Sequence, residues 1–192
     1  MLPLLLASSS VYRRDLLSRL RLPFTCSSPD IDESHHQGET ATELVKRLSL
    51  EKARALAARH PNHLIIGSDQ VAVLDGQIIG KPHTHEKAHQ QLTRASGASV
   101  SFLTGLTLLN SQTGHYQTDC VPFTVHMRSL SAEQIERYLR AEQPYDCAGS
   151  FKAEGLGVSL FQRTEGDDAT SLVGLPLIRL VDMLLAEGVE IP

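Results

Sequence analysis

The stretch Leu64-Ile65-Ile66-Gly67-Ser68-Asp69-Gln70-Val71-Ala72-Val73-Leu74 decides how this chain folds. Its branched apolar residues on both sides of Asp69 predict a buried strand that leads into a hairpin arm. Asp75-Gly76 then makes a tight turn that returns the chain to Gly80-Lys81-Pro82 and brings a lysine near the same strand end. A carboxylate in apolar surroundings needs a cation or a hydrogen-bond donor, and strand ends favour functional sites, so Asp69 is a candidate site residue. The alternative is an aspartate that caps the bend.

The bulk composition predicts an ordinary globular domain. The chain has 192 residues, of which 41% are hydrophobic and 21% charged, and we expect a single domain over residues 1–192. The formal net charge is -4, from 18 basic and 22 acidic residues without a run of like charges. Stable binding to nucleic acid is therefore not expected, whereas small anionic ligands remain possible.

The cysteines and the hydropathy pattern indicate a cytoplasmic protein. Cys26, Cys120 and Cys147 are widely separated and odd in number, which argues against a disulfide framework and a zinc site. The apolar run 2–7 lacks the basic flank and the length of a signal peptide and is better interpreted as a first strand. No window is long enough to span a bilayer, so no membrane association is expected.

Alternating strand-like and helix-like segments predict an α/β fold. The expected strands cover residues 3–7, 24–28, 64–74, 77–79, 100–109, 116–127 and 158–161. The expected helices follow Ser10, Thr40, Thr84, Ser131 and Gly174-Leu175-Pro176, with capping boxes at Thr40/Glu43 and Ser131/Gln134. Residues 100–109 and 116–127 read as an antiparallel hairpin, and 165–168 as a turn. We expect a mixed twisted sheet flanked by helices.

The turn after the first strand suits a phosphate. Ser8 and Ser10 lie between this strand and the N-terminus of a helix, where backbone N–H groups and hydroxyls are available. Arg13 and Arg14 fall in the first turn of the helix, a mildly unfavourable position for cations unless an anion lies nearby. Helix capping alone is the alternative explanation of the serines.

Two further features bear on charge chemistry. The run Asp30-Ile31-Asp32-Glu33 offers hard oxygen ligands for magnesium or manganese if a phosphate binds nearby, and is otherwise a solvated loop. Lys52 continues the apolar row Leu44, Leu48 and Leu56 at a spacing of four, so it must either snorkel or meet a negative partner. The glycine-rich stretch 148–157 is too loose to be a dinucleotide or P-loop signature.

Taken together, these motifs resemble the Maf-like nucleotide pyrophosphatases over nearly the whole chain. The resemblance is carried by Leu6-Ala7-Ser8-Ser9-Ser10 with Arg13-Arg14, Asp32-Glu33, Glu51-Lys52-Ala53, Gly67-Ser68-Asp69-Gln70, Gly80-Lys81-Pro82, Thr104-Gly105, Ala148-Gly149-Ser150-Phe151 and Gly174-Leu175-Pro176. Within the family, the chain is most similar to the 7-methyl-GTP pyrophosphatase (YceF-like) subgroup. The resemblance implies an inosine triphosphatase-like α/β fold and divalent-metal-dependent hydrolysis of a nucleoside triphosphate to the monophosphate and pyrophosphate.

The resemblance also implies roles for single residues. Asp69 is expected to be the catalytic proton acceptor, and Glu33, with Asp69, the metal ligand. Ser8, Ser10, Arg13, Lys52 and Lys81 are expected to bind the phosphates. The expected partner is a small nucleotide, and a homodimer is a family-level expectation.

The positions that select the base in this family carry Tyr12, Gln70 and Glu154 in this chain. A 7-methylated guanine is positively charged, so Tyr12 can stack on it with a cation–π component. Glu154 can accept from its N1–H and amino group side by side, and Gln70 can bind a remaining polar edge. Without the resemblance, Tyr12 reads as a helix-face aromatic and Glu154 as a partner of Lys152.

Two alternative functions remain open from the sequence. One is a pyrophosphatase for UTP, dTTP or other modified nucleotides, although Glu154 disfavours uracil and thymine, each of which offers one N–H on its pairing edge. The other, which the family resemblance brings with it, is a nucleotide-binding regulator of septum formation in which hydrolysis is incidental.

Overall fold

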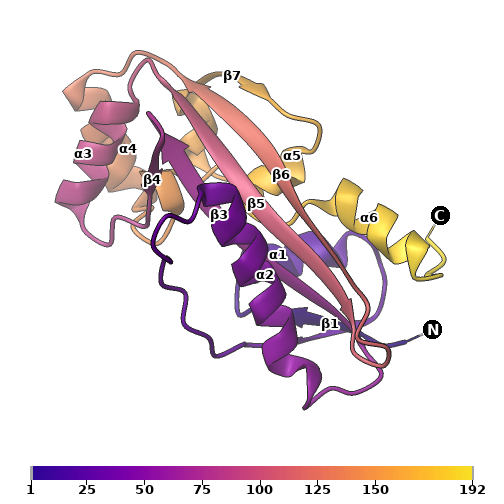
Figure 1. Ribbon diagram of the computed structural model, residues 1–192. Coiled ribbons are helices and arrows are strands. Elements are labelled where there is room, and N and C mark those ends of the chain that lie inside the picture. The colour runs from indigo at the N-terminus through magenta and orange to yellow at the C-terminus, as the bar shows by residue number, and fades with distance from the viewer. Residues whose placement is uncertain (1, 192) are drawn as a thin grey trace. The chain divides into compact units, whose positions relative to one another are not determined.

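A computed structural model describes residues 2–191 of the chain (Figure 1). These residues group into two compact units. Unit 1 comprises Met1–Gln70, Leu103–Val121 and Asp168–Pro192, and unit 2 comprises Val71–Phe102 and Pro122–Asp167. The predicted single domain 1–192, whose end residues 1 and 192 lie outside the described part, stays a prediction.

The strands form one mixed sheet, which confirms the predicted fold class. The strands are β1 (Leu4–Ala7), β2 (Phe24–Ser27), β3 (Leu64–Leu74), β4 (Gln77–Ile79), β5 (Ser99–Asn110), β6 (Tyr116–Met127) and β7 (Phe161–Glu165). Their order is β2-β1-β3-β5-β6-β7, with β4 paired to β3. β1 runs parallel to β2 and β3, whereas β4 is antiparallel to β3 and β7 to β6.

Four of the helices begin directly after the cap residues that the sequence predicts, whereas the sequence patterns do not predict the short helix Ala169–Val173. They are α1 (Val11–Ser18), α2 (Ala41–Ala57), α3 (His85–Ala95), α4 (Ala132–Glu142), α5 (Ala169–Val173) and α6 (Leu177–Ala186). Ser10 caps α1 and Thr84 caps α3, while Thr40 and Ser131 close the predicted capping boxes of α2 and α4. Each cap satisfies backbone N–H groups that have no partner inside the helix, which fixes the first turn.

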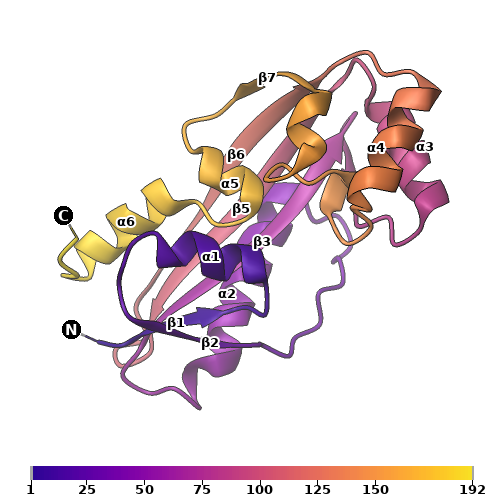
Figure 2. The same cartoon turned by 180° about the vertical axis from the view of Figure 1, so that it is seen from behind.

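In unit 1, helices cover both faces of the strands (Figures 1 and 2). On one face, α1 and α6 pack on Leu4, Leu6, Leu64 and Ile66. On the other face, α2 packs on Leu5, Ala7 and Ile65. Because side chains alternate along a strand, odd-numbered residues of β3 up to Asp69 face α2.

Unit 2 contains α3, α4 and an aromatic cluster. Phe151 packs edge-on against both Phe102 and Phe161, with ring centroids 5.2 and 5.0 Å apart. The strand predicted at 158–161 is wrong, because Leu156–Leu160 forms a 3-10 helix and β7 begins at Phe161. β7 is an edge strand with four exposed residues, so it lacks the apolar run that signals a buried strand.

Gly67 allows α2 to pack directly on β3. A Cβ atom at Gly67 would lie 2.0 Å from the carbonyl oxygen of Ser49, a backbone atom of α2. The helix would have to move away from the strand to accept any side chain there. This close approach brings the middle of α2 next to the residues that follow Gly67 on β3.

We expect Gly67→Ala to lower the free energy of unfolding by about 1–3 kcal/mol or more, since backbone cannot swing aside as a side chain can. Urea denaturation measures the change. Gly80→Ala is the matched control, because a Cβ there meets nothing within 4 Å. Equal unfolding midpoints for the two variants would contradict the close approach.

Candidate active site

The structure places the predicted site residues in both units. Lys81 and Glu154 lie in unit 2. The others lie in unit 1 and are Ser8, Ser10, Tyr12, Arg13, Glu33, Lys52, Asp69 and Gln70. The geometry of each group is therefore described within its own unit.

The centre of the unit 1 group is an ammonium held by two carboxylates. Lys52 Nζ lies 2.6 Å from Asp69 Oδ1 and 2.9 Å from Glu33 Oε1. Lys52 is 7% exposed and Asp69 8% exposed, whereas the side chain of Glu33 is 59% exposed. The prediction that Lys52 meets a negative partner is confirmed. Asp69 lies inside β3 and binds Lys52, so the alternative of a bend cap is wrong.

Local sequence explains why this pair meets. Asp69 follows Gly67 by two positions on β3, so both residues face α2. The missing side chain of Gly67 lets α2 approach, and Lys52 stands on the buried side of that helix. A lysine at an apolar position and a carboxylate at an apolar strand position thus neutralise each other.

Arg13 adds a second cation to this group. Its backbone N–H donates to the Oγ of the cap residue Ser10, and its Nε donates to the carbonyl oxygen of Gly174 at 2.8 Å. Burial lowers the pKa of Arg13, while the carboxylates of Asp69 and Glu33 act in the opposite direction, so the three charges are close. The Nη atoms make no hydrogen bond with the described residues and are available to an anion.

Ser10 caps α1 and Ser8 accepts a hydrogen bond in the turn before it, yet each serine keeps a hydroxyl proton. Ser8 Oγ accepts from the backbone N–H of Ser10 at 3.1 Å, and Ser10 Oγ accepts from that of Arg13 at 3.3 Å. In these bonds the oxygens are acceptors. The capping explanation is confirmed for Ser10 alone, and both O–H groups can still donate to a phosphate.

Gln70 is fixed in orientation by the chain itself. Its Nε2 donates to Ser171 O at 2.7 Å, Thr104 Oγ1 at 3.0 Å and Leu172 O at 3.1 Å. A flipped amide would set Oε1 against carbonyl oxygens, so only Oε1 is left for a ligand. Tyr12 is half-buried at the second position of α1, next to Arg13.

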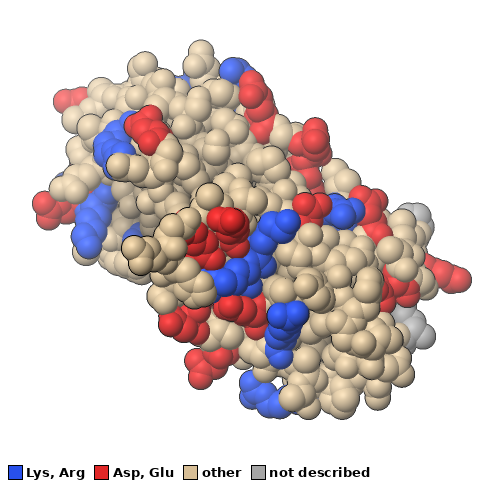
Figure 3. All heavy atoms as spheres, in the orientation of Figure 1, with Lys and Arg blue, Asp and Glu red and all other residues tan. Residues whose placement is uncertain are grey.

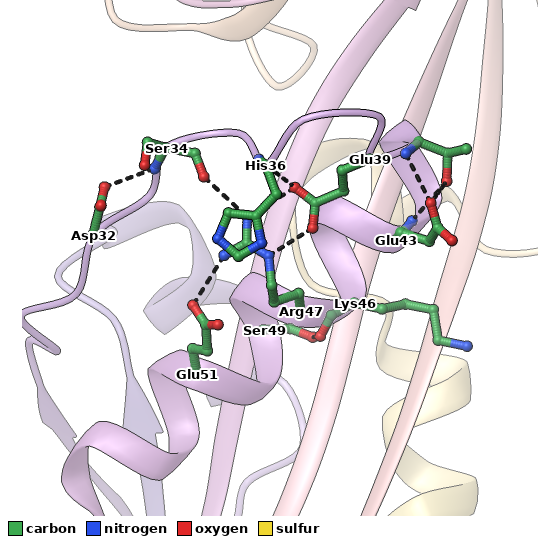
Figure 4. Close-up of polar contacts among 10 residues, drawn as sticks. Asp32, Ser34, His36, Glu39, Glu43, Lys46, Arg47, Ser49 and Glu51 are labelled. Atoms are coloured by element: carbon green, nitrogen blue, oxygen red, sulfur yellow. Dashed lines mark hydrogen bonds and ion pairs between the residues drawn. The ribbon is translucent and has the colours of Figure 1, made fainter.

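Arg47 organises the segment that carries Glu33, a role that the sequence analysis missed (Figure 4). It binds Glu39 through two nitrogens, at 2.6 and 2.9 Å, and also contacts the Ser34 carbonyl and Glu51. Hydrogen bonds from Arg47 lower the pKa of Glu39 to about 2. The i, i+4 spacing of Arg47 and Glu51 predicts their ion pair on a helix. The contacts of Arg47 with Glu39 and Ser34 involve an irregular segment and follow no sequence period.

The donor set of unit 1 can be compared with the needs of a metal ion. Among residues 2–191, no group of three or more His, Cys, Asp or Glu side chains is arranged to hold a metal. Glu33 and Asp69 each use one oxygen for Lys52 and keep the other. Such a pair fits magnesium or manganese, which bind one or two carboxylates together with substrate phosphates rather than a full protein cage.

The two predicted residues of unit 2 lie on its surface. Lys81 is exposed, between Gly80, whose carbonyl accepts from Gln91 Nε2, and the buried Pro82. Glu154 is exposed as well, and Lys152 forms an ion pair with Glu142 at 3.7 Å. The assignment of Lys81 to the phosphates and of Glu154 to the base stays a prediction from the sequence.

We expect Lys52→Met to lower the free energy of unfolding by about 3 kcal/mol, because it leaves the buried carboxylate of Asp69 without its cation. Adding Asp69→Asn should restore part of that loss. Glu33→Gln is the control and should cost less than about 1 kcal/mol, since its side chain is exposed. Urea denaturation of the three variants and of the unsubstituted protein tests this, and equal losses for Lys52→Met and Glu33→Gln would contradict it.

Curated relatives match this chain from end to end. A protein of Pseudomonas fluorescens Pf-5 is 82% identical over 192 residues, covering 100% of both chains. Relatives from Pseudomonas aeruginosa and Alcanivorax borkumensis are 73% and 60% identical over 189 residues, covering 98% of this chain and 98% and 96% of theirs. All three relatives are named 7-methyl-GTP pyrophosphatase.

Comparison with solved structures bears on the fold alone. The Staphylococcus aureus Ham1 protein superposes with a TM-score of 0.53 at 14% identity, covering 97% of this chain and 99% of that one. The likeness confirms the predicted fold.

No helix within residues 2–191 is long and apolar enough to cross a membrane. Residues 3–187 match the family described as Maf-like protein, and the chain belongs to this family.

Proposed function

We propose that this protein hydrolyses 7-methyl-GTP to 7-methyl-GMP and pyrophosphate. The name shared by full-length relatives of 60–82% identity supports this substrate. The observation that carries the proposal is the triplet of Lys52, Asp69 and Glu33 beside Arg13, which offers both cations and a carboxylate base. Water attacks phosphorus, the bond between the α- and β-phosphates breaks, and the proton of the water leaves to a base.

The cations of unit 1 suit the triphosphate. Cleavage of this anhydride is promoted mainly by positioning the phosphates and neutralising their charge. Arg13 can offer its planar Nη groups, since Nε is held by Gly174 and the guanidinium is thereby oriented. The hydroxyls of Ser8 and Ser10 can donate from the same helix N-terminus.

Asp69 is the proposed proton acceptor. Its Oδ1 is bound to Lys52, while its Oδ2 makes no hydrogen bond with the described residues and can face the attacking water. The ion pair with the neighbouring Lys52 holds the carboxylate in place. A magnesium or manganese ion, for which Glu33 and Asp69 are the proposed ligands together with the substrate, would neutralise further charge on the phosphates.

Two residues of unit 1 support a methylated guanine as the base. Tyr12 offers an aromatic face to a positively charged ring. Gln70 offers only Oε1, an acceptor, and guanine carries N–H donors on its pairing edge. The third residue of the base prediction, Glu154, keeps the role expected from the sequence.

Location and partners are part of the proposal. The three cysteines are all free thiols, which supports a reducing cytoplasm. On the face seen in Figure 3, Lys and Arg side chains lie beside Asp and Glu side chains, which favours a small nucleotide over a nucleic acid as the ligand. A homodimer remains a proposal from the family.

Pyrophosphate release from 7-methyl-GTP, GTP, UTP, dTTP and CTP, each with magnesium or manganese, tests the proposed function. We expect the highest kcat/KM with 7-methyl-GTP. Tyr12→Leu should reduce that value by about tenfold while changing GTP turnover less, since the cation–π contact is worth about 1–2 kcal/mol.

Each other result points to an alternative. Turnover mainly of UTP or dTTP would keep the enzyme class and contradict the base assignment. No release of pyrophosphate from any nucleotide would favour the septum regulator. Equal loss for 7-methyl-GTP and GTP in Tyr12→Leu would contradict stacking on the methylated base.

A further inference from the structure

Glu33 lies on a segment that has no regular secondary structure to fix its position. Residues 28–40 connect β2 to α2 without a helix or a strand. The side chain of Glu33 is 59% exposed, and its contact is the ion pair with Lys52. An exposed carboxylate on a long irregular connection gains little from one ion pair, so its position depends on how the backbone around it is held.

Arg47 holds this backbone to α2 through a network of charge-assisted bonds. Its Nε and Nη2 bind the two oxygens of Glu39 in the fork geometry, and the side chains of Arg47 and Glu39 are only 18% and 8% exposed. Nη2 also donates to the carbonyl oxygen of Ser34 at 3.0 Å. Glu51, one turn further along the helix, binds Nη1 at 3.1 Å and restrains the guanidinium from the other side.

These contacts bracket Glu33. Ser34, the next residue, is held through its carbonyl oxygen by Arg47 and through its N–H by Asp32 Oδ1 at 2.9 Å. Glu33 is thus the central residue of an Asx turn whose end is fixed to α2. We call the contacts of Arg47 with Glu39 and Ser34 the clamp. Lys52 projects from the same helix as Arg47, so the clamp and the residue that Glu33 binds lie on one rigid element.

We propose that Arg47 is a positioning residue for the reaction, which holds segment 30–39 on α2 so that Glu33 stays at Lys52 and Asp69. Arg47 touches neither Lys52 nor Asp69 and acts through Glu33. The kinetic part of this inference rests on the proposed function, whereas the structural part does not.

The kinetic test uses a double-mutant cycle with 7-methyl-GTP and magnesium. Arg47→Met should lower kcat/KM on the order of 10- to 100-fold, the range found when residues that orient ligand carboxylates are removed. In a Glu33→Gln background, the same change should cost little more, since both substitutions remove one function. Arg47→Lys should restore only part of the activity, because a lysine cannot form the two-nitrogen contact with Glu39.

A second measurement tests the clamp without turnover. Hydrogen exchange of the amides of residues 30–39 should be faster in Arg47→Met than in the unchanged protein, while the amides of β1 and β3 keep their protection. Lys46→Met is the matched control, because Lys46 precedes Arg47 on α2 and points away from the segment (Figure 4). It should alter neither the exchange nor kcat/KM.

The outcomes separate this inference from the proposed function. The clamp is supported if Arg47→Met speeds hydrogen exchange at residues 30–39 and if the losses of kcat/KM in the double-mutant cycle are not additive in free energy. Unchanged exchange at 30–39, or effects of Arg47→Met and Glu33→Gln that multiply, would overturn it. If the protein without substitutions releases no pyrophosphate, the proposed function alone is contradicted. The hydrogen-exchange data then test the clamp by themselves.

Discussion

The buried contact between Lys52 and Asp69 is the constraint on which the rest of unit 1 depends. Removing two opposite charges from water is costly, and the cost is offset only when the charges meet at hydrogen-bond distance. That distance requires α2 to lie directly on β3, which the missing side chain of Gly67 permits. The pair is therefore a reason for the packing of the helix as well as a consequence of it. A chain that needed only stability could fill both positions with apolar residues.

Around this pair, unit 1 brings groups of opposite charge to one place from separate elements. Arg13 comes from the first turn of α1, where a cation opposes the helix dipole unless an anion is near. Glu33 comes from an irregular segment that Arg47 fastens to α2. An anionic ligand would offset the local cost of placing Arg13 at the start of α1. The arrangement is typical of a site whose groups are stabilised by the substrate that they bind.

Local sequence patterns predicted the centre of the site, and long-range contacts escaped them. Lys52 lies in a row of apolar residues spaced by four, and Asp69 is a single charge within an apolar strand. Both features are local, so both could be predicted from the sequence. The caps at Ser10 and Thr40 likewise fixed where α1 and α2 begin. The amide of Gln70 binds carbonyl groups from a distant part of the chain, and no local pattern announces such a contact. The pattern at 158–161 predicts a strand where Leu156–Leu160 forms a 3-10 helix, because a short apolar run does not distinguish the two.

The central claim is that Asp69 is a base in catalysis rather than only a partner of Lys52. The most direct test compares Asp69→Asn with the unchanged protein in two assays. One assay measures turnover of 7-methyl-GTP, and the other measures calorimetric binding of an analogue with a methylene bridge between its α- and β-phosphates. We predict that kcat falls by about 10²- to 10⁴-fold while the dissociation constant of the analogue does not increase. Retained turnover, or loss of binding together with turnover, would contradict the claim.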